Sequence, residues 1–175
     1  MPTVNADGLL VKYGIEGGLS SRGGGVEESG ASHVTEIAIK ATDIPALAAV
    51  VTPSSTNLAY MHGVEMPLGA RVEKIEVLVE TCFTSGGSAT LDFGFVRADR
   101  TTEYDYNGLI AAQTVASMAT GGTLITLIVG SGTAGALLGT VLANKGIFTV
   151  NYNVAAFTAG KAVVRVYWNF PNNTI

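Results

Sequence analysis

The residues best suited to nucleophilic chemistry are Cys82, the single cysteine of the chain, and its two histidines, His33 and His62. A thiolate beside an imidazole is a strong nucleophile, so either pair would be a candidate catalytic site. However, His62 alternates with Leu58 and Val64 along an apolar row, and His33 borders a glycine-rich segment. Neither spacing matches a catalytic motif. We therefore interpret Cys82 as a packed thiol and expect no enzyme activity.

A second group of reactive side chains, Asp99, Glu103 and Asp105, lies in one expected loop. Carboxylate oxygens are the ligands that hard cations prefer, so a calcium site there would be chemically reasonable. The spacing is not that of an EF-hand loop, and Arg97 and Arg100 compete for the same carboxylates. We therefore favour a solvated or intersubunit ion-pair loop, and we expect no metal or other cofactor.

The glycine pattern GSGTAG at residues 130–135 follows the apolar run 124–129 and matches the G-x-G-x-x-G of dinucleotide-binding turns. Such a site also needs an acidic residue about 20 positions later to bind the ribose. No acidic residue follows Asp105, so we interpret residues 130–135 as a turn between strands. The charged side chains after Asp105 are too sparse for a phosphate-binding surface, which excludes nucleic acid as an expected partner: Lys145, Lys161 and Arg165.

The composition indicates an all-β protein that buries surface against partners. Of the 175 residues, 47% are hydrophobic and only 14% are charged, and 22 are glycine; typical globular chains are roughly 25% charged. Residues 123–143 are apolar and long enough to cross a bilayer. Because they contain four glycines and four threonines, we expect two buried strands joined by a glycine turn, and no membrane association.

Residues 1–33 are expected to form an extended N-terminal arm, and residues 34–175 a β-sandwich domain. The arm contains eight glycines, which raise the entropic cost of ordering it. It also contains one apolar cluster, which favours docking on a partner over an idle tail. The cluster consists of Leu9, Leu10, Val11, Tyr13 and Ile15.

Alternation of apolar and polar residues predicts most strands of the domain. About eight strands result, the number of a jelly-roll-like β-sandwich. Residues 105–119 fit either a short helix or a strand. The remaining strands are expected near residues 34–40, 58–67, 71–83, 89–97, 124–129, 136–143, 148–154 and 162–170.

Two pairs of neighbouring strands are expected to form hairpins. The apolar residues of 71–83 and 89–97 fall mainly on odd positions, so antiparallel pairing on one face needs an odd-numbered loop such as Gly86-Gly87-Ser88. The same reasoning joins 148–154 to 162–170. The sequence FTSG that begins at Phe83 has an echo, FTAG, at residues 157–160.

Three stretches of the chain together resemble the cement or decoration proteins of tailed-bacteriophage heads: DGLLVKYGIEGG, MPLGARVEKIEVLVETCFTSGGSATLDFGFV and FTAGKAVVRVYWN. The resemblance implies a β-sandwich with an extended arm, acting as a trimer that binds the major capsid protein on the outside of the virion. The first residues lack a basic segment followed by an apolar one, so no signal peptide is evident and synthesis in the host cytoplasm is expected.

An alternative interpretation is a phage fibre or tail protein, or a β-sandwich module that binds host glycans. Aromatic side chains on exposed loops are typical of sugar-binding surfaces, and Tyr104 and Tyr106 lie in the expected loop at residues 99–108. The sequence alone does not decide whether this loop binds a glycan or a cation.

Overall fold

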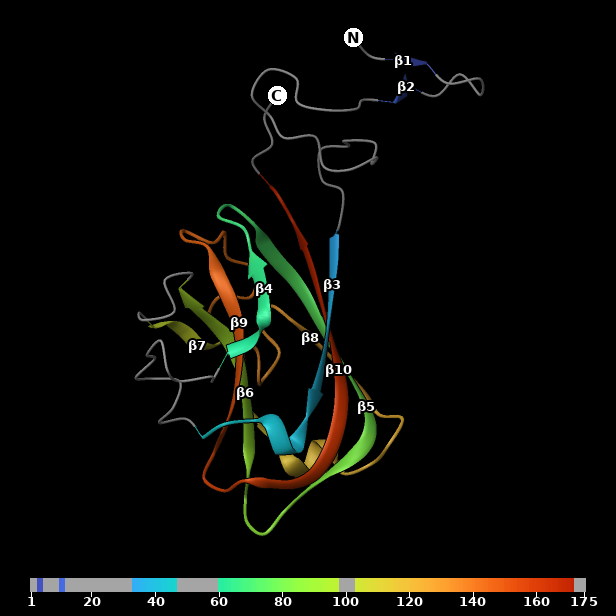
Figure 1. Cartoon of the computed structure of the whole chain (residues 1–175), viewed down its shortest axis with the longest axis vertical. Helices are drawn as coiled ribbons and strands as arrows, with labels where there is room; N and C mark the ends of the chain where they lie inside the picture. The colour runs from blue at the N-terminus through green and yellow to red at the C-terminus, as the bar shows by residue number, and fades with distance from the viewer. Residues whose placement is uncertain (1–2, 5–9, 12–32, 47–59, 98–102, 172–175) are drawn as a thin grey trace.

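The computed structural model describes residues 3–4, 10–11, 33–46, 60–97 and 103–171 (Figure 1). Within these residues the chain forms strands and two short 3-10 helices, and no α-helix. The 3-10 helices are η1 (Ala41–Asp43) and η2 (Val115–Met118). The strands are β1 (Thr3–Val4), β2 (Leu10–Val11), β3 (His33–Lys40), β4 (Tyr60–Met66), β5 (Arg71–Ser85), β6 (Thr90–Arg97), β7 (Glu103–Thr114), β8 (Leu124–Ile128), β9 (Gly146–Asn153) and β10 (Phe157–Asn169).

Two four-stranded antiparallel sheets form the sandwich. Sheet I has the order β3-β10-β5-β8, and sheet II has the order β4-β9-β6-β7. The strands pair in a nested series, β3 with β10, β4 with β9, β5 with β8 and β6 with β7. This is the pairing of one long hairpin wound on itself, which defines a jelly roll. The expected all-β, jelly-roll-like sandwich is therefore confirmed.

The two expected hairpins are wrong. β5 and β6 lie in different sheets, and so do β9 and β10. Their connections cross from one sheet to the other, because β5 is already paired on both sides, with β10 and β8. The matching odd or even positions of the apolar residues in consecutive strands are still explained. The two apolar rows face each other across the core, instead of lying side by side in one sheet.

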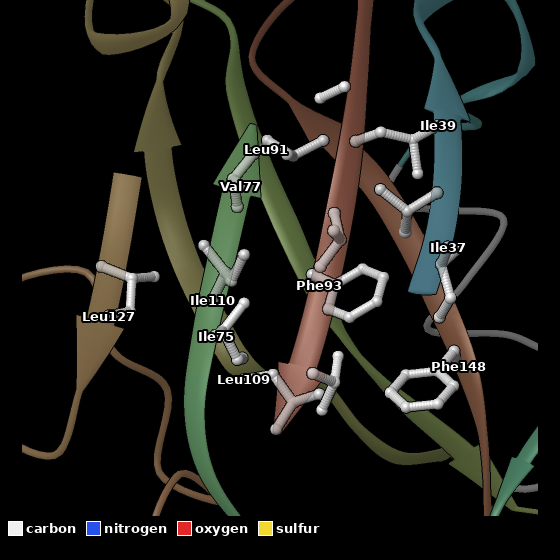
Figure 2. Close-up of a cluster of buried hydrophobic side chains, with 14 of the residues drawn as sticks. Ile37, Ile39, Ile75, Val77, Leu91, Phe93, Leu109, Ile110, Leu127 and Phe148 are labelled. Carbon is white, nitrogen blue, oxygen red and sulfur yellow. The ribbon is translucent and has the colours of Figure 1, made fainter. Parts of the chain in front are cut away.

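The core is filled from both sheets (Figure 2). Ile75 and Val77 of sheet I and Leu91, Phe93 and Phe148 of sheet II are fully buried, and the rings of Phe93 and Phe148 stack with centroids 5.5 Å apart. Burial of large apolar side chains is the main stabilising contribution, at about 25 cal/mol per Å² removed from water. The alternating apolar positions of the sequence therefore correspond to the inner faces of the two sheets.

The two similar sequences, FTSG at residues 83–86 and FTAG at residues 157–160, contact each other in the folded chain. The ring of Phe83 on β5 contacts the ring of Phe157 on β10 edge-on, with centroids 5.2 Å apart, and both rings are buried. The hydroxyl oxygens of the next residues, Thr84 and Thr158, lie 2.8 Å apart. Gly160 has φ of +137°, and a Cβ at this position would overlap the Phe83 ring. The echo therefore reflects two strands that close the same end of the core.

The expected strand at residues 136–143 is wrong: the connection between β8 and β9, residues 129–145, consists of turns. Its backbone bonds to strands of both sheets, and its two β-bridges, at Ala134 and Val141, are isolated. Near its start, the N–H of Gly135 donates to the carbonyl of Leu109 on β7, at 3.0 Å. Further along, the N–H of Gly139 donates to the carbonyl of Val72 on β5, at 2.7 Å. We call residues 129–145 the seam loop, because it joins the sheets along one side of the sandwich.

The structure assigns two further segments, residues 105–119 and residues 130–135. Residues 105–119 contain the second half of β7 and η2, so the strand alternative is confirmed and the helix alternative is wrong. Residues 130–135 form turns of the seam loop, as expected, and a Cβ on Gly135 would overlap the carbonyl of Asn107.

In the described part of the chain, no helix is long and apolar enough to cross a membrane.

The close approach of β7 to β6 gives a stability prediction. A Cβ on Gly94 would overlap the backbone carbonyl of Asp105, which cannot move without disturbing the sheet, so Gly94→Ala should lower the free energy of unfolding by about 1–3 kcal/mol. Gly86→Ala is the matched control, because no atom lies within 4 Å of its added methyl group. Urea unfolding of both variants checks this, and equal midpoints would contradict the packing around Gly94.

Candidate interaction surfaces

The outer face of sheet I carries a row of apolar side chains that crosses all four strands. Val163 on β10 lies opposite Ala38 on β3 and opposite Leu78 on β5, and Leu78 lies opposite Leu124 on β8. Ala38 and Leu124 are exposed, and Val163 and Leu78 are half-buried. We call these four residues the apolar row. Contiguous exposed apolar surface of this kind is typical of protein interaction sites.

On one side of the apolar row, the neighbouring charged side chains are paired with one another; on its other side Lys40 and Lys161 lie opposite each other and form no ion pair within the described residues. Arg165 lies between Glu36 and Glu76 in the register of the sheet, and its Nε donates to Glu36 at 2.9 Å. Lys74 Nζ donates to Glu76 at 2.8 Å, and the hydroxyl of Tyr167 donates to the other carboxylate oxygen of Glu76 at 2.8 Å. Lys74 also lies 3.9 Å from the centroid of the Tyr167 ring. We call these five residues the ionic row.

The ionic row shifts the pKa values of its members. The hydrogen bonds from Lys74 and Tyr167 hold the pKa of Glu76 below its usual range, since they favour the carboxylate. The same bonds raise the pKa of Lys74 and of Tyr167. Two acids and two bases therefore neutralise each other across this face. A face of paired charges loses less free energy on being covered than one with isolated charges.

The base of the expected arm is fixed by aromatic rings. The His33 ring stacks on the Trp168 ring with centroids 4.4 Å apart, and Phe170 packs edge-on against Trp168 at 5.3 Å. The indole N–H of Trp168 donates to the Thr35 hydroxyl at 3.0 Å. The first residue of β3 is therefore held against the last residues of β10.

The predicted arm cluster lies largely outside the described residues. Leu9, Tyr13 and Ile15 are not described, whereas Leu10 and Val11 form β2, which pairs with β1 through Thr3↔Val11 and Val4↔Leu10. The side chains of Leu10 and Val11 are not described either. The domain division at residues 1–33 and 34–175 stays a prediction.

The candidate nucleophile and base are far apart. Cys82 is a partly exposed free thiol near one end of β5. His33 lies opposite Trp168, which lies opposite Val72 near the other end of β5. Ten residues of strand span about 33 Å, so Cys82 and His33 cannot form a catalytic pair. His62 lies on β4, and its side chain is outside the described residues.

The expected cation and glycan loop is only partly described. Asp99 and Arg100 lie outside the described residues, as does the side chain of Glu103. Asp105 lies on β7, where burial raises its pKa and a hydrogen bond from the backbone of Asn107 opposes that effect. In the part of the chain that the structure describes, no three His, Cys, Asp or Glu residues are grouped to hold a metal ion.

The two tyrosines of the glycan-binding interpretation lie on β7, not in a loop. Tyr104 is half-buried, with its ring 6.2 Å from the ring of Phe95. Its hydroxyl accepts a hydrogen bond from the N–H of Ala143 at 3.2 Å, so it holds the end of the seam loop. Tyr106 is half-buried on the same strand.

A pocket of about 290 Å³ was not predicted from the sequence. It lies beside η1, with an apolar floor that includes Ile39 and Val150 and an edge that carries charges of both signs, Lys40, Asp43 and Lys161 among them. Its walls come from β3, β5, β9 and β10, so only the tertiary arrangement brings them together. The apolar row was missed for the same reason, since its members share a face only once the register is known.

The ionic row gives a pH prediction. Because the folded-state pKa of Glu76 is lowered, its stabilising contribution is present above the unfolded-state pKa and is lost as pH falls through the folded-state pKa. Glu76→Gln should therefore lower the urea midpoint slightly near neutral pH, and the difference from the parent chain should vanish in strong acid. Glu65→Gln, at an exposed residue on β4, is the control. A difference that stays constant with pH would contradict the assignment.

Comparison with known proteins gives matches in structure only. No protein-family model and no curated protein matches the chain. A chain in the acidic stable capsid structure of Helicobacter pylori bacteriophage KHP30 is 17% identical with a TM-score of 0.46, covering 82% of this chain and 91% of that one. A chain in the capsid of Ralstonia phage GP4 is 17% identical with a TM-score of 0.44, covering 82% of this chain and 88% of that one. A chain in the capsid asymmetric unit of cyanophage Pam1 is 20% identical with a TM-score of 0.42, covering 86% of this chain and 92% of that one.

Proposed function

We propose that the chain is a non-enzymatic structural protein of a phage virion that binds the outside of the capsid and stabilises it. Its partners are the major capsid protein and further copies of itself, in a trimer. Three features support this proposal: the sequence resemblance to cement and decoration proteins, the jelly-roll sandwich, which is an architecture that viral capsid proteins use, and the outer face of sheet I.

The observation that carries the proposal is the apolar row beside the ionic row. Together they make a continuous four-stranded face on which apolar residues, such as Leu124 at 53% exposure, lie beside the paired charges of the ionic row. These two rows suit contact with another protein surface, because covering them removes apolar area from water while each charge of the ionic row keeps its partner. In this proposal the face lies against the capsid, and the arm adds contacts to the capsid or to a neighbouring copy.

The apolar row gives a direct test. Leu124→Glu should reduce occupancy on capsids that lack the protein by about tenfold or more, because an unpaired carboxylate would be buried in the contact. Leu68→Glu is the matched control, since Leu68 is 58% exposed and lies in the turn between β4 and β5, away from this face. Cosedimentation at matched protein concentrations measures occupancy, and equal binding by both variants would refute the assigned face.

Deletion of residues 1–30 tests the arm. The shortened chain should lose capsid attachment while its far-ultraviolet circular dichroism remains that of a β protein. A full-length control with serine at Leu9, Val11, Tyr13 and Ile15 separates the apolar cluster from mere chain length. If the shortened chain coats capsids at full occupancy, the arm has no part in attachment.

A further inference from the structure

Three of the four sheet edges carry features that block the addition of another strand. The outer side of β7 is bonded by the seam loop, as in the 2.9 Å bond from the N–H of Ala111 to the carbonyl of Thr133. β8 has five residues and leads directly into the same loop. β4 follows β9 with a break in register between Tyr60 and Glu65. Short, covered or irregular edges are how proteins avoid edge-to-edge pairing.

The fourth edge, β3, has none of these features. Its eight residues follow β10 in unbroken register from Lys40↔Lys161 to His33↔Trp168. It contains no proline, no glycine and no bulge, and among the described residues no strand pairs with its other side. Its inner face buries Ile37 and Ile39, whereas its outer face is exposed. A regular, unpaired edge of this kind is a template for a further strand.

The arm contains a sequence that suits this edge. In residues 9–15, the odd positions are all apolar, whereas of the three even positions Lys12 and Gly14 are not and Leu10 is. This is the alternation of a half-buried strand, and part of it, Leu10–Val11, forms β2. Added beside β3 with its odd positions inward, it would continue the buried row of Ile37 and place Lys12 on the same side as the acidic Glu36.

We propose that residues 9–15 of a neighbouring copy add to β3 as a fifth strand of sheet I. This inference rests on the self-association proposed above. In the described structure Leu10 and Val11 pair with β1 and not with β3 of their own chain. Residues 16–32 can span at most about 55–60 Å, more than the width of a domain with a radius of gyration of about 15 Å. The arm is therefore long enough to reach β3 of another copy.

Cross-linking of the full-length chain tests this pairing. In a Cys82→Ser background, tagged chains with Lys12→Cys are mixed with untagged chains with Ala38→Cys, and a bismaleimide that joins only adjacent strands is added. Tagged–untagged dimers should form about tenfold faster than with Leu124→Cys, which lies on the same face at the opposite edge. Equal rates would overturn the proposal, and so would a chain with both Lys12→Cys and Ala38→Cys that cross-links only within itself.

A second pair of variants tests which face of the arm strand is buried. Val11→Asp should abolish the cross-link between Lys12→Cys and Ala38→Cys chains, whereas Leu10→Asp, on the other face, should leave it. Equal effects of the two would overturn the proposal. Native mass spectrometry of the chains without cross-linker distinguishes the failures. An intact oligomer without the cross-link refutes only the β3 site, whereas a monomer refutes the proposed self-association as well.

Discussion

β10 is hydrogen-bonded on both sides, and this double pairing organises the rest of the molecule. It brings the end of the chain between β3 and β5, so that the strands nest as one wound hairpin. The same register places Arg165 between Glu36 and Glu76, and Val163 between Ala38 and Leu78. Both rows of the outer face therefore depend on where β10 lies.

The pairing of β10 also decides where the chain ends leave the sandwich. Its last residues lie opposite the first residues of β3, where Trp168 and Phe170 hold His33. Figure 1 shows the C-terminal end of β10 and the N-terminal end of β3 at the same end of the sandwich. An arm that starts from this point is anchored by a strand that is paired on both sides.

The sequence predicted where most strands lie but not which strands pair with one another. Periodicity in Ile75, Val77 and Val79 identified β5 and its buried face, because alternation is a local property. It could not tell whether Leu91 and Phe93 lie beside that row or across the core from it, since both arrangements keep the same parity. Residues 136–143 were misassigned because apolar composition does not reveal that these residues form turns, in which Gly139 bonds to Val72 on β5 and Leu142 bonds to Ala70 just before β5.

Candidate surfaces were harder to predict, because they join residues that are distant in sequence. Leu78, Leu124 and Val163 are ordinary alternating positions in three separate strands, and only the register makes them neighbours. Among the candidate nucleophile and bases, Cys82 and His33 lie near opposite ends of sheet I, and the side chain of His62 is outside the described residues. Tyr104 was expected in the loop at residues 99–108; it lies on β7 and its hydroxyl bonds to the seam loop.

The seam loop has a consequence for how many copies can join. Because the seam loop covers β7 and directly follows the short β8, β3 is the receptive edge among the described strands, and the strand exchange proposed there would be a head-to-tail contact in which each copy gives one strand and accepts one. Contacts of this type close into rings when the rotation between copies is favourable. A ring closed in this way leaves no receptive edge free among the described strands, so such an assembly would be finite and a continuous fibre of stacked sheets would be avoided.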